Sequence, residues 1–377
     1  MAASRQFPAS YQQSRKAFLE DLKRVQVRWP DARLESRTVP AEGGLAIEWI
    51  AADPAGSPRR ALVVVCGVHG VESFVGSRMR GLLVDEFLDR LDPETTALTL
   101  VHTANPWGMV HGRRVTRNNV DLNRNFALER GDFQSEINPE YRLFDHFLNP
   151  DRPLWPLWLE IPEVVVSVLA TLLRAGVKRF RNAVLQGQRV NPRGLYFTGK
   201  GYEPETRIVM DLVKEIFSKV EDVLLLDMHT GYGPKYQMSI VNSPQEGRTS
   251  AQLREDFHYP LVQKADPDQF YSMQGDMVDW LYKYRKSAGL GGKFYGGTFE
   301  FGTIGETIPH EFISLWNGIF ENQAYWKGAV SEPIRTKAQE NFREMYFPSE
   351  EKWRQKALAD CREGLTGVLR SEGYILE

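Results

Sequence analysis

Hydrophobic and polar positions alternate along this chain in blocks that predict strands and helices in turn. Six apolar residues run without interruption from Ala61 to Cys66, and a second apolar run covers Asp222–Met228. Such runs, bounded by glycine or a turn, indicate strands buried on both faces, as in a parallel sheet. Further strands are predicted at 45–51, 96–103 and 297–301. Helical periodicity is predicted over 10–27, 74–87, 161–186, 204–219, 273–286, 309–327 and 349–370.

These elements predict one α/β domain over residues 1–377, with a motif-bearing core at about 45–330 and helical extensions at both ends. The expected fold class is a mixed, mostly parallel central sheet with helices on both faces and a helical insertion around 150–190. Within the insertion, two prolines and two glutamates interrupt the most apolar stretch, 154–173, so we expect no membrane span. If this stretch is partly exposed, Trp155, Leu157 and Trp158 would suit a subunit contact, which leaves a homo-oligomer open.

Composition excludes some function classes. The chain is 42% hydrophobic and 25% charged, with a formal net charge of -2. Nucleic-acid binding needs a concentrated basic surface, so we expect no nucleic-acid partner. Two cysteines are too few for a disulfide framework, and the N-terminus lacks an apolar core of signal-peptide length. A cytoplasmic location is therefore expected.

Residues with metal-binding chemistry follow the first buried strand. His69 and Glu72 stand three positions apart, just beyond Cys66 in the segment CGVHGVE. Ligands collect at the carboxyl edge of an open α/β sheet, and an imidazole and a carboxylate can share one zinc ion. The alternative is a capping histidine followed by a glutamate that starts a helix.

The second buried strand ends in the same manner, in Asp227-Met-His-Thr-Gly. If the two strands lie side by side, His229 approaches His69 and Glu72. Three protein ligands that leave a position open for water are typical of catalytic zinc. The alternative is a core histidine held by backbone carbonyls.

Between the two strands, four arginines gather within a dozen residues: Arg113, Arg114, Arg117 and Arg124. Arginine offers a planar fork to a carboxylate and asparagine adds directional donors, so Asn123 and Arg124 suggest recognition of a substrate carboxylate. An arginine nearer the metal would stabilise an oxyanion. The alternative is a solvated basic loop.

Near the C-terminal end of the predicted core, Glu300 lies between aromatic residues in the segment GGTFEFG. Apolar surroundings raise the pKa of a carboxylate, which suits a general base that works near neutral pH. The alternative is a strand glutamate that faces solvent.

Five segments in this order, HGVE, NPWG, NNVDLNRNF, LDMHTG and TFEFG, resemble the zinc carboxypeptidase superfamily. The similarity is strongest to a bacterial branch of metallopeptidases of uncharacterised function, and it covers about Ala61 to Gly302. It implies a single zinc ion (Zn2+) held by His69, Glu72 and His229, with Asp121 orienting a ligand histidine.

The resemblance also implies roles around that ion. Glu300 matches the general base, and Arg114 matches the arginine that polarises the scissile carbonyl, with the adjacent Arg113 as the alternative. Asn123 and Arg124 match the pair that holds the terminal carboxylate of the substrate.

Two features depart from the digestive enzymes of this superfamily. The tyrosine that those enzymes close on the substrate has no unambiguous counterpart, and Tyr232, Tyr236 and Tyr295 are all candidates. The tail of the insertion, 186–201, either reaches the active site or forms a surface loop, and we expect the surface loop.

The predicted function is a zinc-dependent hydrolase that cleaves an amide bond next to a free carboxylate through a Glu-activated, zinc-bound water. A carboxypeptidase that acts on short peptides is the simplest form. A deacylase of N-acyl amino acids is the alternative with the same machinery, and a non-catalytic carboxylate-binding protein is the alternative from another class.

Overall fold

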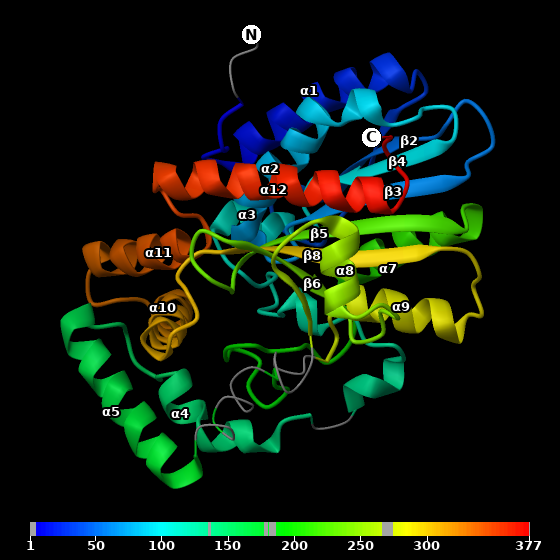
Figure 1. Cartoon of the computed structure of the whole chain (residues 1–377). Coiled ribbons are helices and arrows are strands. Elements are labelled where there is room, and N and C mark those ends of the chain that lie inside the picture. The colour runs from blue at the N-terminus through cyan, green and yellow to red at the C-terminus, as the bar shows by residue number, and fades with distance from the viewer. Residues whose placement is uncertain (1–4, 135–136, 177–179, 181–185, 266–273, 377) are drawn as a thin grey trace.

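The computed structural model describes residues 5–134, 137–176, 180, 186–265 and 274–376. Its centre is an eight-stranded sheet with the strand order β1-β2-β4-β3-β5-β8-β6-β7 (Figure 1). The strands are β1 Arg33–Thr38, β2 Ala46–Ala52, β3 Arg60–Cys66, β4 Thr96–Val101, β5 Asp222–Gly231, β6 Met238–Asn242, β7 Val262–Lys264 and β8 Phe294–Gly302.

Parallel pairs form the middle of the sheet. β3 pairs in parallel with β4 and β5, β5 with β8, and β6 with β7, whereas β1–β2, β2–β4 and β6–β8 are antiparallel. The predicted fold class, a mixed and mostly parallel α/β sheet, is confirmed. β3 and β5 do lie side by side, as the hypothesis of a shared site required.

The described helices are α1 Tyr11–Arg28, α2 Ser73–Glu86, α3 Pro106–His111, α4 Asp145–Leu148, α5 Leu157–Ala175, α7 Pro204–Lys219, α8 Ser250–Phe257, α9 Met277–Ser287, α10 Ile308–Lys327, α11 Glu332–Tyr346 and α12 Glu351–Ser371. Within the described part of the chain, none of them combines the length and apolarity needed to cross a bilayer.

Alternation along β3 shows how the helices cover the sheet. Leu62, Val64 and Cys66 pack into a core with α1, α2, α8 and α12. Val63 and Val65 point to the opposite face and pack with α7 and α9. Successive strand residues face opposite sides, so an unbroken apolar strand requires helices on both faces. Figure 1 shows this three-layer arrangement.

The insertion forms a third apolar cluster, in which α4 and α5 pack against α10. α5 begins at Leu157, four residues before the start of the predicted helix 161–186, and the continuation of that prediction over 177–179 and 181–185 falls outside the described residues. Trp155 and Trp158 are exposed, Trp158 by 72%, while Leu157 packs partly into the cluster. A subunit contact there stays a prediction.

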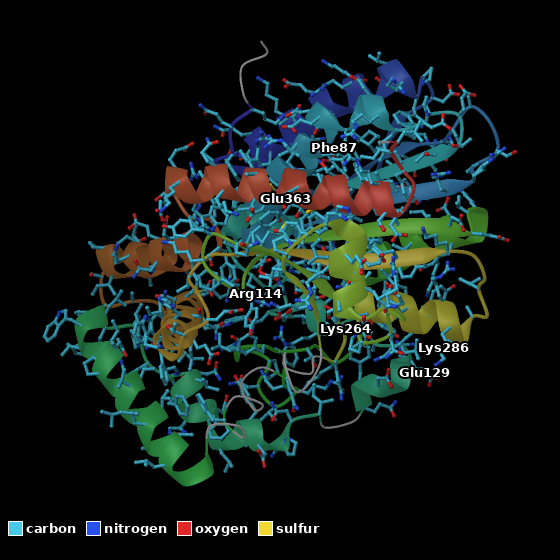
Figure 2. The ribbon with its side chains drawn as sticks, viewed as in Figure 1. Phe87, Arg114, Glu129, Lys264, Lys286 and Glu363 are labelled. Atoms are coloured by element: carbon cyan, nitrogen blue, oxygen red, sulfur yellow. The ribbon has the colours of Figure 1, made fainter. Side chains whose placement is uncertain are left out.

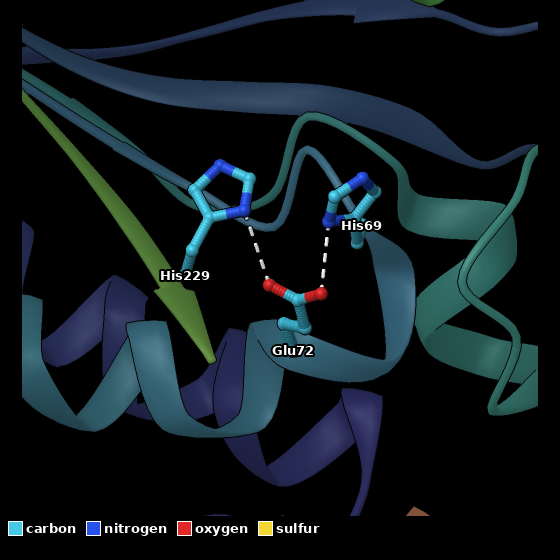
Figure 3. A group of neighbouring side chains, drawn as sticks. All are labelled: His69, Glu72 and His229. Atoms are coloured by element: carbon cyan, nitrogen blue, oxygen red, sulfur yellow. Dashed lines mark ion pairs between the residues drawn. The ribbon is translucent and has the colours of Figure 1, made fainter. Parts of the chain in front are cut away.

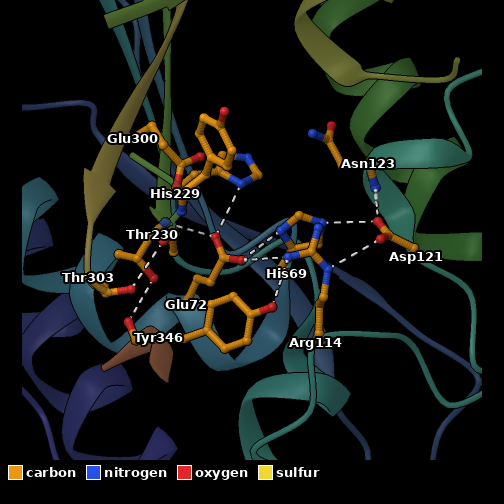
Figure 4. Close-up of polar contacts among 12 residues, drawn as sticks. His69, Glu72, Arg114, Asp121, Asn123, His229, Thr230, Glu300, Thr303 and Tyr346 are labelled. Atoms are coloured by element: carbon orange, nitrogen blue, oxygen red, sulfur yellow. Dashed lines mark hydrogen bonds and ion pairs between the residues drawn. The ribbon is translucent and has the colours of Figure 1, made fainter. Parts of the chain in front are cut away.

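Several elements were not predicted. β1 is a polar edge strand with mostly exposed residues, and β6 and β7 are short, so hydrophobic patterning gave no signal for them. α3, α8 and α11 were also missed. α11 matters for function, because its last residue, Tyr346, lies in the candidate site (Figure 4).

Candidate active site

The candidate site forms where β3 and β5 end. Cys66 is paired with Met228 in the parallel register, so the residues that follow leave the sheet at the same edge. The chain turns at Gly67, whose φ is +69°, and His69 and Glu72 come with the short 3-10 helix Gly70–Glu72. A Cβ on Gly70 would lie 2.2 Å from the carbonyl carbon of Gly108, so close packing on α3 requires glycine there.

The structure brings His69, Glu72 and His229 together. One ligand atom from each lies within 4.8 Å of the other two, and all three side chains are buried. Nδ1 of His69 is 2.8 Å from Oε1 of Glu72, and Nδ1 of His229 is 3.2 Å from Oε2 (Figure 3). Glu72 therefore faces both imidazoles, one with each oxygen.

Each histidine is held from behind by an aspartate. Nε2 of His69 is 3.0 Å from Oδ1 of Asp121, and Nε2 of His229 is 2.7 Å from Oδ2 of Asp227 (Figure 4 shows the first pair). A carboxylate on Nε2 fixes the tautomer and leaves Nδ1 to bind a cation. Asp121 lies against Nε2 of His69, and the orienting role that the resemblance implied for it stays a prediction, whereas Asp227 was missed.

This donor set fits a divalent zinc ion. Two imidazole nitrogens and one carboxylate are a ligand set that zinc prefers when a further position is left open. Among the described residues, none meets the geometry of a hydrogen bond to the buried Nδ1 of His69, although Oε1 of Glu72 lies 2.8 Å away. A buried polar atom without a partner needs an explanation, and a cation shared with Glu72 supplies one.

The charges of this group are strongly coupled. Burial alone would raise the pKa of Glu72, but the facing imidazoles of His69 and His229 hold it well below its usual range. For His229, burial acts to lower the pKa, and the carboxylates of Asp227 and Glu72 raise it well above its usual value. The site therefore has a strong preference for positive charge.

Glu300 lies beside the metal-ligand candidates. It is paired with His229 in the register of β5 and β8, and Figure 4 shows the two side chains at the same strand ends. The backbone N–H of Tyr232 donates to Oε1 of Glu300 over 3.0 Å. Burial, and then the negative charge of Glu72, raise the pKa of Glu300 to about 8.

Arg114 points into the same site. Its Nη1 is 3.3 Å from Oε1 of Glu72 and 3.2 Å from the hydroxyl of Tyr346, while Nε donates to Asp121 over 3.2 Å. Figure 2 places Arg114 in the middle of the molecule and Lys286 at its edge. The guanidinium is held by Asp121 and directed toward Glu72.

The structure places Arg113 elsewhere. Its guanidinium bonds to Glu321 over 2.7 Å and to Asn322 over 3.0 Å, and it stacks 3.8 Å above the ring of Tyr325. All three partners belong to α10, so the Arg113 guanidinium anchors that helix. Of the two adjacent arginines, Arg114 is the one at the site.

Asn123 and Arg124 are both engaged inside the protein. The side-chain amide of Asn123 donates to Asp276 over 2.9 Å and accepts from the N–H of Met277 over 3.0 Å. Nη1 of Arg124 donates to Asp121, and its guanidinium lies 4.8 Å from the ring centre of Tyr196. Segment 186–201, expected as a surface loop, therefore reaches this part of the structure.

The tyrosine candidates from the sequence differ in position. The hydroxyl of Tyr295 bonds to Asn242 in the core, and that of Tyr236 bonds to Glu350. Tyr232 contacts Glu300 through its backbone. Tyr346 is the phenol next to Arg114, and no short sequence motif marks it.

A family model matches residues 7–360, and its description is "Protein of unknown function (DUF2817)". The chain belongs to this family. No protein of curated function matches the chain.

Several solved structures are similar to this chain. Carboxypeptidase A from Helicoverpa armigera is 14% identical over 93% of this chain and 73% of its own, with a TM-score of 0.48. Bovine thrombin-activatable fibrinolysis inhibitor, in complex with tick carboxypeptidase inhibitor, is 14% identical over 89% and 96%, with a TM-score of 0.46. Murein-tripeptide amidase from Escherichia coli O157 is 20% identical over 76% and 91%, with a TM-score of 0.38.

Proposed function

We propose that this protein is a zinc-dependent hydrolase of amide bonds. The observation that supports this most strongly is the convergence of His69, Glu72 and His229 within 4.8 Å, with Glu300 on the adjacent strand. A buried ligand set next to a carboxyl group with a raised pKa is typical of catalytic rather than structural metal sites.

The chain supplies the other groups that amide hydrolysis requires. A bound zinc ion would provide a Lewis acid for the carbonyl and lower the pKa of water. Burial raises the pKa of Glu300, and the positive charge of a bound zinc ion would lower it again, so the Glu300 carboxylate would accept a proton from the attacking water and return it to the departing nitrogen. Arg114, fixed by Asp121, supplies a positive charge where negative charge develops on the carbonyl oxygen.

Short peptides are the substrate class that we propose. Both finer predictions from the sequence, the carboxypeptidase and the N-acyl amino acid deacylase, require a group that holds a free carboxylate. Asn123 and Arg124 were expected in that role, but both side chains have partners within the protein. The contacts of Asn123 and Arg124 therefore support cleavage of an amide bond without requiring a free carboxylate beside it.

Two substitutions test the proposal. Glu300→Gln is expected to retain stoichiometric zinc and lose about 100-fold to 10,000-fold in turnover, because a general base contributes about that factor. His69→Ala is expected to lose the metal itself. Metal content by mass spectrometry and hydrolysis of a peptide panel by chromatography measure the two effects.

Glu306→Gln is the matched control, since Glu306 is an exposed glutamate shortly after β8. It is expected to behave as the wild type. Full turnover in Glu300→Gln would remove Glu300 as the base. Stoichiometric zinc without hydrolysis of any substrate in the panel would indicate a non-catalytic binding protein instead.

A further inference from the structure

The guanidinium of Arg124 is enclosed on several sides. Asp121 bonds to it, and the ring of Tyr196 covers it with a separation of 4.8 Å from the ring centre. The Arg124 side chain is 1% exposed, whereas that of Arg114 is 19% exposed. Of these two arginines, only Arg114 presents its charge to an incoming ligand.

Backbone contacts hold the covering segment in place. The N–H of Gln188 donates to Tyr196 over 2.9 Å, and the carbonyl of Leu195 accepts from the hydroxyl of Tyr141 over 3.0 Å. The N–H of Asp121 donates to the carbonyl of Phe197 over 2.8 Å. Residue 196 itself has a φ of +57°, which is unusual for a side chain as large as tyrosine. Strain of this kind persists where the surrounding contacts require it.

Gly187 also packs closely against Arg124. Its φ is +86°, and a Cβ at this position would lie 2.8 Å from Cδ of Arg124. The segment from Gly187 to Phe197 thus lies directly against the arginine. Removal of this cover would require a backbone rearrangement or a rotation of the Tyr196 ring.

The carboxylate of Asp121 has other partners in the site besides Arg124. The same carboxylate faces Nε2 of His69 over 3.0 Å and accepts from Nε of Arg114 over 3.2 Å. A substrate carboxylate that replaced Asp121 would leave that buried charge without part of its compensation, and an uncompensated buried charge is costly. Arg124 therefore serves to neutralise Asp121 beneath the metal-ligand candidates.

We infer that Tyr196 and Asp121 occlude Arg124, so that this hydrolase does not require a free carboxylate next to the scissile amide. Tyr196 is then the residue that determines this specificity. The inference rests on the proposed function for the reaction itself. It predicts that peptides with a blocked C-terminal end are substrates on equal terms with free ones.

A matched pair of peptides tests the inference, one that ends in a carboxylate and the same peptide that ends in a carboxamide. In the zinc-loaded wild type, the ratio of the two kcat/KM values is expected to stay within about threefold. Tyr196→Gly uncovers the guanidinium and suits the positive φ, so the ratio is expected to shift about tenfold toward the carboxylate, as one charge-assisted hydrogen bond would give. Tyr196→Phe keeps the ring and is expected to match the wild type.

Accessibility of Arg124 gives a readout that does not depend on turnover. Phenylglyoxal modification followed by peptide mapping is expected to spare Arg124 in the wild type and in Tyr196→Phe, and to label it in Tyr196→Gly. A wild type that prefers the carboxylate by more than tenfold and labels readily at Arg124 would overturn the inference.

Failure of the proposed function has a different signature. If zinc-loaded protein hydrolyses neither peptide, the same pair is compared by equilibrium binding. Equal dissociation constants would still support the occlusion of Arg124, and a tenfold tighter constant for the carboxylate would contradict it.

Discussion

The orientation of two imidazole rings decides what the candidate site can bind. His69 and His229 meet edge to face with ring centres 5.0 Å apart, and each has an aspartate on Nε2. Both rings therefore present Nδ1 toward Glu72. Without the two aspartates, either ring would have the alternative tautomer available, in which Nδ1 carries the proton and cannot bind a metal.

Asp227→Asn tests this support at a single residue. Loss of the charge behind His229 lowers the basicity of the ring, so the dissociation constant for zinc is expected to rise about 10-fold to 100-fold. Competition with a chromogenic chelator measures it. Asp211→Asn is the matched control, because Asp211 is an exposed aspartate on α7 and lies outside the site. An unchanged zinc constant in Asp227→Asn would show that the aspartate does not support the ligand.

Single residues differ in how far the sequence could reveal them. The sequence could reveal His229 and Glu300, because each lies on an apolar strand whose end the hydrophobic pattern predicts. Asp227 had a usable signal, since residues two apart on a strand share a face. For Arg113 and Arg114 only the resemblance gave a signal, because adjacent positions in an irregular turn carry no periodicity that tells which of them faces Glu72. Tyr346 belongs to a helix that the pattern did not predict.

At the level of elements, the start of α7 holds an unusual pair of acidic side chains. Glu203 and Glu205 are both buried, and Glu203 accepts hydrogen bonds from Thr116 and Asn118. Burial raises the pKa of Glu205 to about 7, with a further contribution from the nearby Glu203. The folded protein therefore binds a proton here more tightly than the unfolded chain does.

This burial predicts how stability varies with pH. In the folded protein the pKa of Glu205 is raised from 4.5 to about 7. Its contribution to the unfolding free energy is therefore fully present below about pH 4.5 and is lost as the pH rises through 7. The loss amounts to about 3 kcal/mol of unfolding free energy. Glu205→Gln does not titrate, so its stability is expected to fall less between pH 5 and pH 8. Denaturant unfolding at the two pH values measures the difference.

Glu215→Gln on the same helix is the control for that experiment. Glu215 is exposed and paired with Lys219, so the substitution is expected to leave the pH dependence of the wild type in place. An equally steep fall between pH 5 and pH 8 in Glu205→Gln would assign the effect to other groups.

Elements with a strong apolar period were predictable, and those without one were not. α1, α7, β3 and β5 agree with the sequence prediction to within a few residues. α11 has a polar composition and only three buried residues, so few apolar positions marked it in the sequence. Its position was set by packing against α10, which a local pattern does not contain.

At the scale of the whole molecule, the site depends on strand order rather than on sequence order. β3 and β5 are neighbours although β4 lies between them in the chain, and Tyr346 arrives from a helix near the C-terminus. The strand ends predicted that His229 would meet His69 and Glu72 only on the condition that these two strands are neighbours, and local patterns do not fix strand order. The physical reason is that contacts between distant segments are fixed by the assembled sheet.

Because the ligand candidates come from separate parts of the chain, metal binding should stabilise the entire fold. An ion that binds only the folded state adds about 2.7 kcal/mol of unfolding free energy at 100 times its dissociation constant. The thermal midpoint of the wild type is therefore expected to rise when zinc is added and to fall again with a chelator. Differential scanning calorimetry measures the shift, and His69→Ala is expected to show none. A midpoint of the wild type that is insensitive to zinc would mean that His69, Glu72 and His229 do not hold a common ion in solution.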